Sequence, residues 1–329
     1  MKCKKILTAL LAAACTMSGC HGDLDIMQDN KLSASNMWID ESDAETATYG
    51  IYLYLRDALK SVHDIYLCWG EFRNGLWGAG TNKTLSGVDQ TQVRTSTMSS
   101  SNAYADWSVM YKTDNQANGE AVNGPGYYLG WNSNYVEAAY QNNPVPITGG
   151  NQWWWYTDRY KALLTSVEGD TRTKLTYNRA DYGTTIKSIE WTEKGVGQMI
   201  SGARIFDSDF ILYRYAEAFL MDAEIKYYRK DYGGALTALG EIIKRAYGNA
   251  AHYTDQSEAA VKRAIVEESL KELVGEGRTW WTLIRLDAVW EYNKDVADKR
   301  ESNANILLWP ITQESIIKNS KLKQTEGWY

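Results

Sequence analysis

The chain has 329 residues, of which 35 are basic and 41 acidic, so its formal net charge at pH 7 is −6. Proteins that bind nucleic acid hold the phosphates with clustered basic side chains, and this acidic balance argues against nucleic acid as a partner. The length is enough for one large hydrophobic core or two modest ones.

The first 19 residues have the pattern of a bacterial signal peptide. Three lysines precede an apolar stretch at residues 6–14, which is too short to cross a bilayer. We therefore predict that residues 1–19 are removed. The mature chain then keeps 32 of the 35 basic side chains beside all 41 acidic ones, and its net charge becomes −9.

The signal ends at a cysteine that we predict carries lipid. Residues 17–20 resemble the lipobox of bacterial lipoproteins, with Met17 where leucine is usual, so that Cys20 becomes the acylated N-terminus. Two or more acyl chains hold a protein stably on a membrane. Two alternatives stay open: cleavage before Cys15, which leaves a shorter apolar core, and an ordinary secretory signal whose cysteine is incidental. Cys68 then remains as a single packed thiol, and no disulfide forms.

The pattern after the signal predicts a tether and one folded domain. Residues 20–38 are polar and without period, and we assign them to the tether, with a single domain at residues 39–329. Apolar residues recur every three or four positions from residue 40 to 62, which predicts an amphipathic helix. Residues 69–101 are predicted to be a loop, and residues 102–118 a second helix.

Beyond residue 118 the pattern is irregular to about residue 202. The helical pattern is strongest at residues 207–247, where the turn is placed at residues 232–234, and it resembles one tetratricopeptide helix pair. One pair cannot bury its own apolar face and needs neighbours, and the sequence shows no second copy. Ser257 is predicted to cap a helix that ends near Val274, and the tail from residue 307 is predicted to be irregular.

Four stretches carry motifs that point to one protein family. They are Asn36–Trp38 with Gly50–Tyr52, Trp107–Asn118, Tyr213–Glu224, and Leu308–Ile311 with Gln324 and Gly327–Tyr329. They resemble the SusD/RagB family, whose members are surface lipoproteins of Bacteroidota that bind nutrients for TonB-dependent transporters. The matching regions cover about residues 20–118 and 205–329, in the right order.

The resemblance implies a fold, a location and a role. The fold is expected to be mainly α, with SusD-like tetratricopeptide-type helical repeats reduced in number and a loop-rich aromatic face. The chain is expected to be anchored through acylated Cys20 on the outer surface of the cell outer membrane. There it would bind a glycan and deliver it to a SusC-like TonB-dependent transporter.

The chain also departs from the family pattern. Several more helical repeats normally follow a helix like the one that ends at Asn118, whereas this chain continues directly to Gly119, so a middle block of repeats is absent. In addition, Ser269, Thr279 and Thr282 stand where the family usually has Arg, Arg and Asp. Those positions ordinarily form charge-assisted contacts between helices.

Two loops combine aromatic rings with polar side chains, as a sugar site requires. Tryptophan and tyrosine are abundant, with 14 Trp and 23 Tyr against 4 Phe, and each has a flat apolar face and a polar edge. The candidate ligand-binding residues are Trp69, Arg73, Asn74, Trp77, Trp131, Trp153, Trp154, Trp155 and Tyr156. If these loops form the site, Trp77→Ala or Trp154→Ala abolishes binding and leaves the melting temperature nearly unchanged. The competing interpretation is that these rings fill the core.

Other classes of function have weaker support in the sequence. A glycoside hydrolase needs two carboxylates across a cleft. The candidates, which are supported only by abundance, are Asp207, Asp209, Glu217 and Glu224. The three histidines are scattered, so no metal is predicted. We predict a binding protein that is not an enzyme and has no cofactor, with a peptide-binding or purely structural lipoprotein as the alternatives.

Overall fold

The computed structural model describes residues 65–80, 87–106, 152–181, 188–201, 203–206 and 213–328, and the single positions 41, 42, 45, 49, 55, 56, 58, 59, 208 and 211. The chain divides into two compact units, Met1–Tyr54 and Leu55–Tyr329. In the first unit the four described positions are helical, in agreement with the predicted helix. Cys20, the signal peptide and the tether lie outside the described residues, and the assignment of one domain to residues 39–329 stays a prediction.

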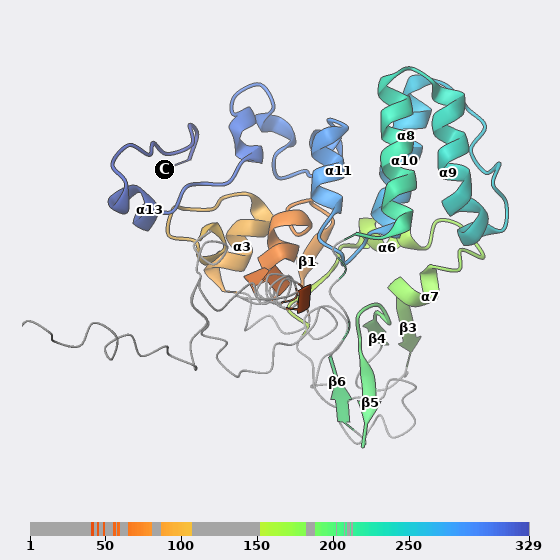
Figure 1. Ribbon diagram of the computed structural model, residues 1–329, viewed down its shortest axis with the longest axis horizontal. Helices are drawn as coiled ribbons and strands as arrows, with labels where there is room; N and C mark the ends of the chain where they lie inside the picture. Colours follow the sequence, from red (N-terminus) through yellow and green to blue (C-terminus); the bar gives the residue numbers. More distant parts are fainter. Residues whose placement is uncertain are drawn as a thin grey trace, which may run out of the picture. The chain divides into compact units, whose positions relative to one another are not determined.

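The described part of the second unit is mainly helical, as predicted (Figure 1). Its helices and 3-10 turns are α3 (Val88–Thr95), η2 (Ala103–Ala105), α6 (Asp158–Leu164), α7 (Thr173–Thr176), α8 (Tyr215–Tyr228), α9 (Tyr232–Tyr247), α10 (Glu258–Glu272), α11 (Thr279–Arg285), α12 (Val289–Tyr292), η5 (Ala297–Lys299), η6 (Ala304–Leu307) and α13 (Gln313–Lys318). Residues 65–70 are also helical. Among the residues that are described, no helix is both long and apolar enough to cross a membrane.

The described strands are short and pair in chain order. They are β1 (Trp77–Ala79), β2 (Trp154–Tyr156), β3 (Asn178–Asp181), β4 (Ser188–Trp191), β5 (Gln198–Ile200) and β6 (Ala203–Ile205). They form three antiparallel ladders of two strands each, β1 with β2, β3 with β4, and β5 with β6. Most of them lie in the segment that the sequence pattern predicted to be irregular, as do α6 and α7. Elements of three to seven residues are too short to show a clear period, and partners elsewhere in the chain stabilise them.

α8 and α9 form the predicted helix pair, but their turn lies earlier than predicted. Residues 232–234 are the first turn of α9, and Asp231 caps the helix by accepting a hydrogen bond from the Gly234 amide at 2.9 Å. A Cβ on Gly234 would stand 2.0 Å from a carboxylate oxygen of Asp231, so glycine leaves room for this cap. Ala223 and Ala235 are fully buried between the helices, as expected where two helices approach closely.

Two further expectations can be compared with the described elements. The predicted cap of Ser257 is confirmed, because its side chain accepts a hydrogen bond from the Ala260 amide at the start of α10. α10 ends at Glu272, two residues before the predicted end. The predicted helix at residues 102–118 begins as the 3-10 turn η2, which Asn102 caps, and residues 107–118 lie outside the described part.

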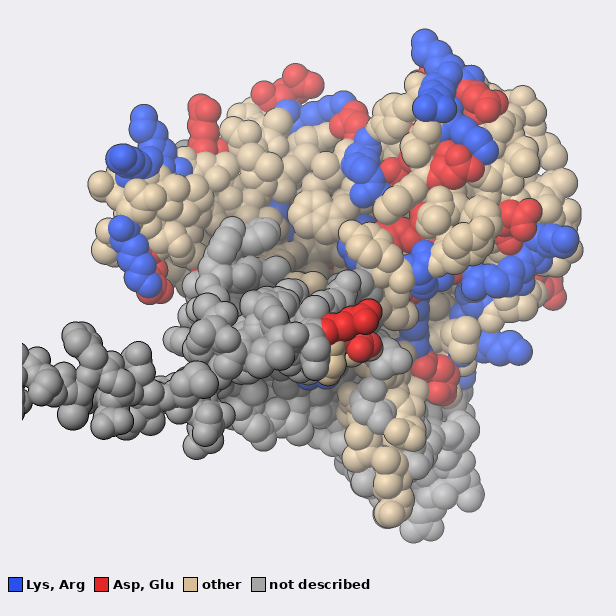
Figure 2. Space-filling view, in the orientation of Figure 1, with Lys and Arg blue, Asp and Glu red and all other residues tan. Residues whose placement is uncertain are grey.

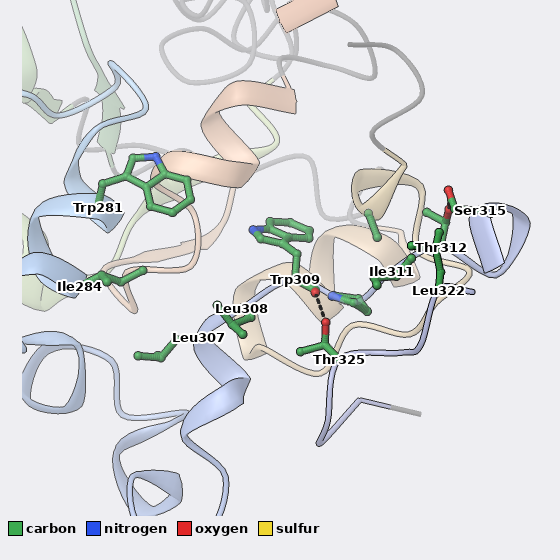
Figure 3. A pocket seen from close by; sticks show the side chains of 12 residues that line it. Trp281, Ile284, Leu307, Leu308, Trp309, Ile311, Thr312, Ser315, Leu322 and Thr325 are labelled. Atoms are coloured by element: carbon green, nitrogen blue, oxygen red, sulfur yellow. Dashed lines mark hydrogen bonds between the residues drawn. The ribbon is translucent and has the colours of Figure 1, made fainter. Parts of the chain in front are cut away.

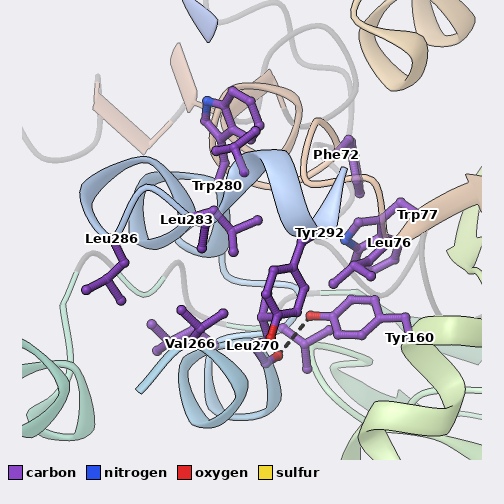
Figure 4. Packing of buried hydrophobic residues seen from close by; sticks show 14 of the residues in the cluster. Phe72, Leu76, Trp77, Tyr160, Val266, Leu270, Trp280, Leu283, Leu286 and Tyr292 are labelled. Atoms are coloured by element: carbon purple, nitrogen blue, oxygen red, sulfur yellow. Dashed lines mark hydrogen bonds between the residues drawn. The ribbon is translucent and has the colours of Figure 1, made fainter. Parts of the chain in front are cut away.

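The hydrophobic core of the second unit is built around α10 and α11 (Figure 4). Leu270 of α10 and Leu283 of α11 are fully buried, and the ring of Tyr160 from α6 lies beside Leu270. The Tyr160 hydroxyl donates a hydrogen bond of 2.8 Å to the carbonyl oxygen of Leu270. The Tyr160 ring is therefore buried while its hydroxyl keeps a hydrogen bond, and this bond links α6 to α10.

Buried charges join the end of α10 to four other segments. Three carboxylates of this region are nearly excluded from solvent: Glu268, Glu272 and Glu276. The basic side chains that pair with them are Arg172, Lys194, Arg214 and Arg245. Five of these pairs span 2.5 to 3.3 Å. Because a buried charge is tolerated only when it is paired, this cluster fixes where those segments meet α10.

The three positions at which the sequence departs from the family pattern carry uncharged side chains, and two of them accept hydrogen bonds. Thr279 accepts a hydrogen bond of 3.1 Å from the Asn74 side chain, and Thr282 accepts one of 3.3 Å from Arg285. Ser269 is buried, and its hydroxyl has no hydrogen-bond partner among the described residues.

Exposed charges of both signs are interspersed over the described elements on the face shown in Figure 2.

Candidate ligand-binding site

The structure brings together the two loops that the sequence analysis proposed as the site. β1 and β2 pair antiparallel, with Trp77 opposite Tyr156 and Ala79 opposite Trp154. Gly80 stands close to the second loop, because a Cβ on it would lie 1.9 Å from the carbonyl oxygen of Gln152. The sequence analysis did not predict that these two loops meet. They meet because β1 and β2, which are 77 residues apart, pair in one ladder.

The rings of these loops, however, face one another and not solvent. Trp77 and Trp154 are each 1% exposed. Phe72 lies between them, stacked on Trp154 with ring centroids 3.9 Å apart and edge-on to Trp77 at 5.2 Å. Tyr156 completes the cluster at 4.7 Å from Trp77. A ring packed in this way offers no face to a sugar, so these side chains belong to the core, and their assignment as ligand contacts is corrected.

The other tryptophans of the prediction are buried, partly buried or outside the described residues. Trp69 is buried, and its indole nitrogen donates a hydrogen bond of 2.7 Å to the carbonyl oxygen of Tyr104. Trp155 donates one of 2.9 Å to Glu190, which ties β2 to β4. Trp153 is half-buried against the core. Trp131 lies outside the described residues.

Arg73 and Asn74 are also buried, and both hold distant parts of the chain. The Arg73 guanidinium donates hydrogen bonds to the backbone carbonyls of residues 306, 307 and 308. It lies over the rings of Trp280 and Trp309, 4.7 and 5.2 Å from their centroids. Burial lowers the pKa of Arg73 to about 9, so it remains charged at neutral pH and keeps these contacts. Arg73 therefore positions the segment that forms the wall of a pocket.

This pocket lies between α11 and the C-terminal segment, and it is our candidate site (Figure 3). It has a volume of about 660 Å³. Its lining is Ala105, Trp281, Ile284, Leu307, Leu308, Trp309, Pro310, Ile311, Thr312, Ser315, Leu322 and Thr325. Trp281 is 37% exposed and Leu308 53% exposed, so ligand can reach apolar surface here without disturbing the core.

Hydrogen bonds between side chains and the backbone hold the walls of the pocket in place. The side-chain amide of Gln324 accepts from the Ile311 amide and donates to the Ile311 carbonyl, each at 2.8 Å. The Thr325 hydroxyl donates to the carbonyl oxygen of Trp309 at 3.2 Å, the bond drawn in Figure 3. These bonds therefore link residues 309–311 to residues 324 and 325.

The polar groups of the pocket are neutral. Ser315 accepts a hydrogen bond of 2.8 Å from the Thr312 hydroxyl, which leaves its own proton to donate. The indole nitrogen of Trp309 is buried and has no hydrogen-bond partner among the described residues. None of the lining residues that the structure describes has an ionisable side chain. These residues can bind apolar faces and hydroxyl groups.

The described residues do not suggest a metal or cofactor centre. No group of three or more His, Cys, Asp or Glu side chains within the described ranges could hold a metal ion. His252 packs between Tyr247 and Tyr253, and the other two histidines lie outside the described part. Cys68 is buried, as expected.

The sequence contained a signal for this pocket that was used only for the family resemblance. Leu308–Ile311 and Gln324 are among the motif residues, and Trp281 follows Trp280 in the short helix α11. The sequence of these segments does not show that they share a cavity, because Arg73, which is remote in sequence, contacts both Trp280 and Trp309.

The chain is similar to known proteins of one family. The model of the SusD family matches residues 104–328. The starch-binding protein SusD of Bacteroides thetaiotaomicron is 24% identical over 176 residues, which are 51% of this chain and 31% of that protein. The crystal structure of a SusD superfamily protein from Bacteroides fragilis is 27% identical, with a TM-score of 0.52, over 64% of this chain and 50% of that one. This chain therefore spans half or less of the length of these two relatives.

Proposed function

This chain belongs to the SusD family, and we propose that it is a nutrient-binding protein that captures a neutral oligosaccharide in the pocket between α11 and the C-terminal segment. The observation that supports this most directly is that Trp281 and Trp309 line one open pocket beside neutral hydroxyl groups. Tryptophan faces suit the C–H surfaces of a sugar ring, and hydroxyls suit its rim. The side chains of the described lining are uncharged, which favours a neutral ligand.

The proposal includes binding without cleavage. The relative from Bacteroides thetaiotaomicron is named a starch-binding protein, and the described residues of the pocket lining include no pair of carboxylates of the kind that glycoside hydrolysis uses. The oligosaccharide is expected to be released unchanged to a SusC-like TonB-dependent transporter in the outer membrane. The family resemblance supports this partner.

Replacing Trp281 by alanine should weaken oligosaccharide binding by at least about thirtyfold. An aromatic residue at the centre of a binding site commonly contributes about 2 kcal/mol or more, which corresponds to that factor. Because Trp281 is already 37% exposed, the melting temperature should change little. Affinity electrophoresis in gels with starch and other neutral polysaccharides, followed by titration calorimetry with the best ligand, measures the effect.

Trp290→Ala is the matched control. Trp290 is a half-buried tryptophan of α12 that is absent from the pocket lining and donates a hydrogen bond to Asp287. This variant should bind like the wild type. Equal affinities of the wild type and Trp281→Ala would contradict the proposed site. If instead no polysaccharide binds and an apolar peptide does, the apolar lining serves the peptide-binding alternative.

The proposal places the chain on the outer membrane through lipid on Cys20. We expect Cys20→Ala to release it into the soluble fraction, since a lipid anchor requires the acylated cysteine. Fractionation of cells that express each form, followed by immunoblotting, measures the distribution. If the variant still sediments with outer membranes at high salt, something other than acylated Cys20 holds the protein there.

A further inference from the structure

A second, smaller pocket is lined by residues of α6, α10 and α12, and it shares no lining residue with the pocket that contains Trp281. Its volume is about 250 Å³. Leu76 and Tyr292, which are 1% and 5% exposed, line it together with Leu163, so part of its wall is apolar and belongs to the core. Pockets for drug-sized ligands have volumes of about 300–1,000 Å³, so this pocket suits a smaller molecule.

Two arginines and two glutamates line the same pocket. Arg159 of α6 is held in position, because its Nη1 donates hydrogen bonds of 3.1 Å to the backbone carbonyls of Glu291 and Tyr292. Its guanidinium carbon also lies 4.8 Å from the centroid of the Tyr292 ring. A guanidinium has five N–H groups. The three on Nε and Nη2 bond no acceptor in the described part of the chain, and they remain for a ligand.

The other three charged side chains of the pocket make no direct polar contact. Among the described residues, Arg263 and Glu267 of α10 and Glu291 of α12 form neither a hydrogen bond nor an ion pair through their side chains. Arg263 precedes Glu267 by four residues, and a base before an acid is the less favourable order for a pair within a helix. Charges of both signs therefore line the pocket, and no direct contact within the chain neutralises them.

The carboxylate of Glu267 is the least compensated of these charges. Burial raises the pKa of Glu267, and the nearby charge of Glu291 adds to this rise. Lys271 and Arg263 act in the opposite direction but do not outweigh burial. Lys271 also donates a hydrogen bond of 3.0 Å to the Tyr247 hydroxyl, so its ammonium group is engaged elsewhere. A positive group in the pocket would stabilise the charge of Glu267, and the two glutamates therefore favour a cationic partner.

The four charges determine which class of ligand fits. A neutral sugar would remove charged groups from water without pairing them, which is costly. A metal ion would satisfy only the glutamates, and a phosphate or sulfate only the arginines. An α-amino acid carries an ammonium group and a carboxylate on one carbon atom, and carboxylates accept paired hydrogen bonds from arginine. An aliphatic side chain on the same carbon would contact Leu76 and Leu163.

We propose that this pocket binds a free aliphatic α-amino acid, with its carboxylate against Arg159 and Arg263 and its ammonium group against Glu267 and Glu291. This is a second binding activity of the chain. It does not depend on the oligosaccharide pocket, because the two linings have no residue in common.

Three compounds with the same branched carbon chain test the roles of the charges. Saturation-transfer NMR with the full chain, carrying Cys20→Ala to remove the lipid, should detect binding of L-leucine. 4-Methylpentanoate lacks the ammonium group and 3-methylbutylamine lacks the carboxylate, so each should bind at least about tenfold more weakly than leucine. If leucine does not bind, or if either analogue binds as tightly as leucine, the proposal is wrong.

Substitutions in the pocket locate the site. Glu267→Gln keeps the size of the side chain and removes its charge, so it should weaken leucine binding at least about tenfold. Arg263→Gln should have an effect of the same size with an unchanged circular dichroism spectrum, because the Arg263 side chain is exposed. Glu241→Gln, at an exposed position of α9 outside the pocket, is the matched control and should bind like the wild type. Wild-type affinity for leucine in either pocket variant would refute the site, and a parallel loss of polysaccharide binding would contradict the independence of the two pockets.

Discussion

Trp77→Ala should lower the free energy of unfolding by about 3–5 kcal/mol, the usual cost of truncating a large aromatic ring in a packed core. Trp77 is 1% exposed and contacts Phe72, Tyr156 and Tyr160, with ring centroids between 4.7 and 5.8 Å apart. A typical domain is stable by about 5–15 kcal/mol, so this loss takes a large share of the total. Urea unfolding followed by intrinsic fluorescence measures it.

This outcome reverses the expectation from the sequence, which was that the variant would keep its melting temperature. Trp281→Ala provides the control, since the same substitution at a 37% exposed position should cost about 1 kcal/mol or less. If Trp77→Ala is as stable as Trp281→Ala, the Trp77 ring is not part of a packed core and the original assignment to a ligand site regains support.

Arg214→Ala should also destabilise the protein strongly, by about 3 kcal/mol. Arg214 contacts Glu272 at 2.5 Å and Glu276 at 2.7 Å, and both carboxylates are nearly excluded from solvent. Removing one partner of a buried pair commonly costs about 3–5 kcal/mol, and the lower figure applies because Arg172 and Lys194 remain. Arg300→Ala is the matched control. Its pair with Asp287 is half-exposed, so the loss should be at most about 1 kcal/mol.

The same substitution should change how stability depends on pH. Burial by itself would raise the pKa of Glu272, but the contacts with Arg214 and Arg245 outweigh burial and lower this pKa from 4.5 to about 2. A carboxylate with a lowered pKa in the folded state contributes stability above about pH 4.5, and the contribution is lost as the pH falls toward 2. Acid unfolding of Arg214→Ala should therefore begin at a higher pH than that of the wild type. Identical acid transitions would show that Arg214 does not hold the Glu272 charge.

The helical class of the fold could be predicted from the sequence, because α9 has a clear apolar period and α10 begins after a capping serine. The α8–α9 pair and the cap at Ser257 were predicted for this reason, and the SusD-like helical fold is supported by the family match. The ladder of β1 with β2 could not be predicted, since three-residue strands carry no readable period and their partner is remote. For the same reason the burial of Trp77 in the core could not be predicted.

The candidate site was misplaced for a related reason. Aromatic and polar residues that cluster in sequence also occur wherever a core needs rings with satisfied polar edges, and only burial separates the two cases. Arg73 illustrates this, because an arginine in a glycine-rich loop suggested a ligand contact, and its acceptors are carbonyls more than 230 residues away. Trp281 and Trp309 were not among the candidates, although Trp281 stands beside Trp280 and is followed by Thr282.

The contacts of residues 71–74 determine when this chain can finish folding. Glu71 accepts hydrogen bonds from the amides of Gly275 and Gly277, and Arg73 donates to carbonyls from residue 306 onward. A chain that emerges N-terminus first cannot make these contacts until its last quarter has been delivered. High contact order of this kind slows folding and leaves apolar surface exposed for longer. An exported chain would therefore need to be shielded from aggregation during transit, and its N-terminal half should not fold when produced alone.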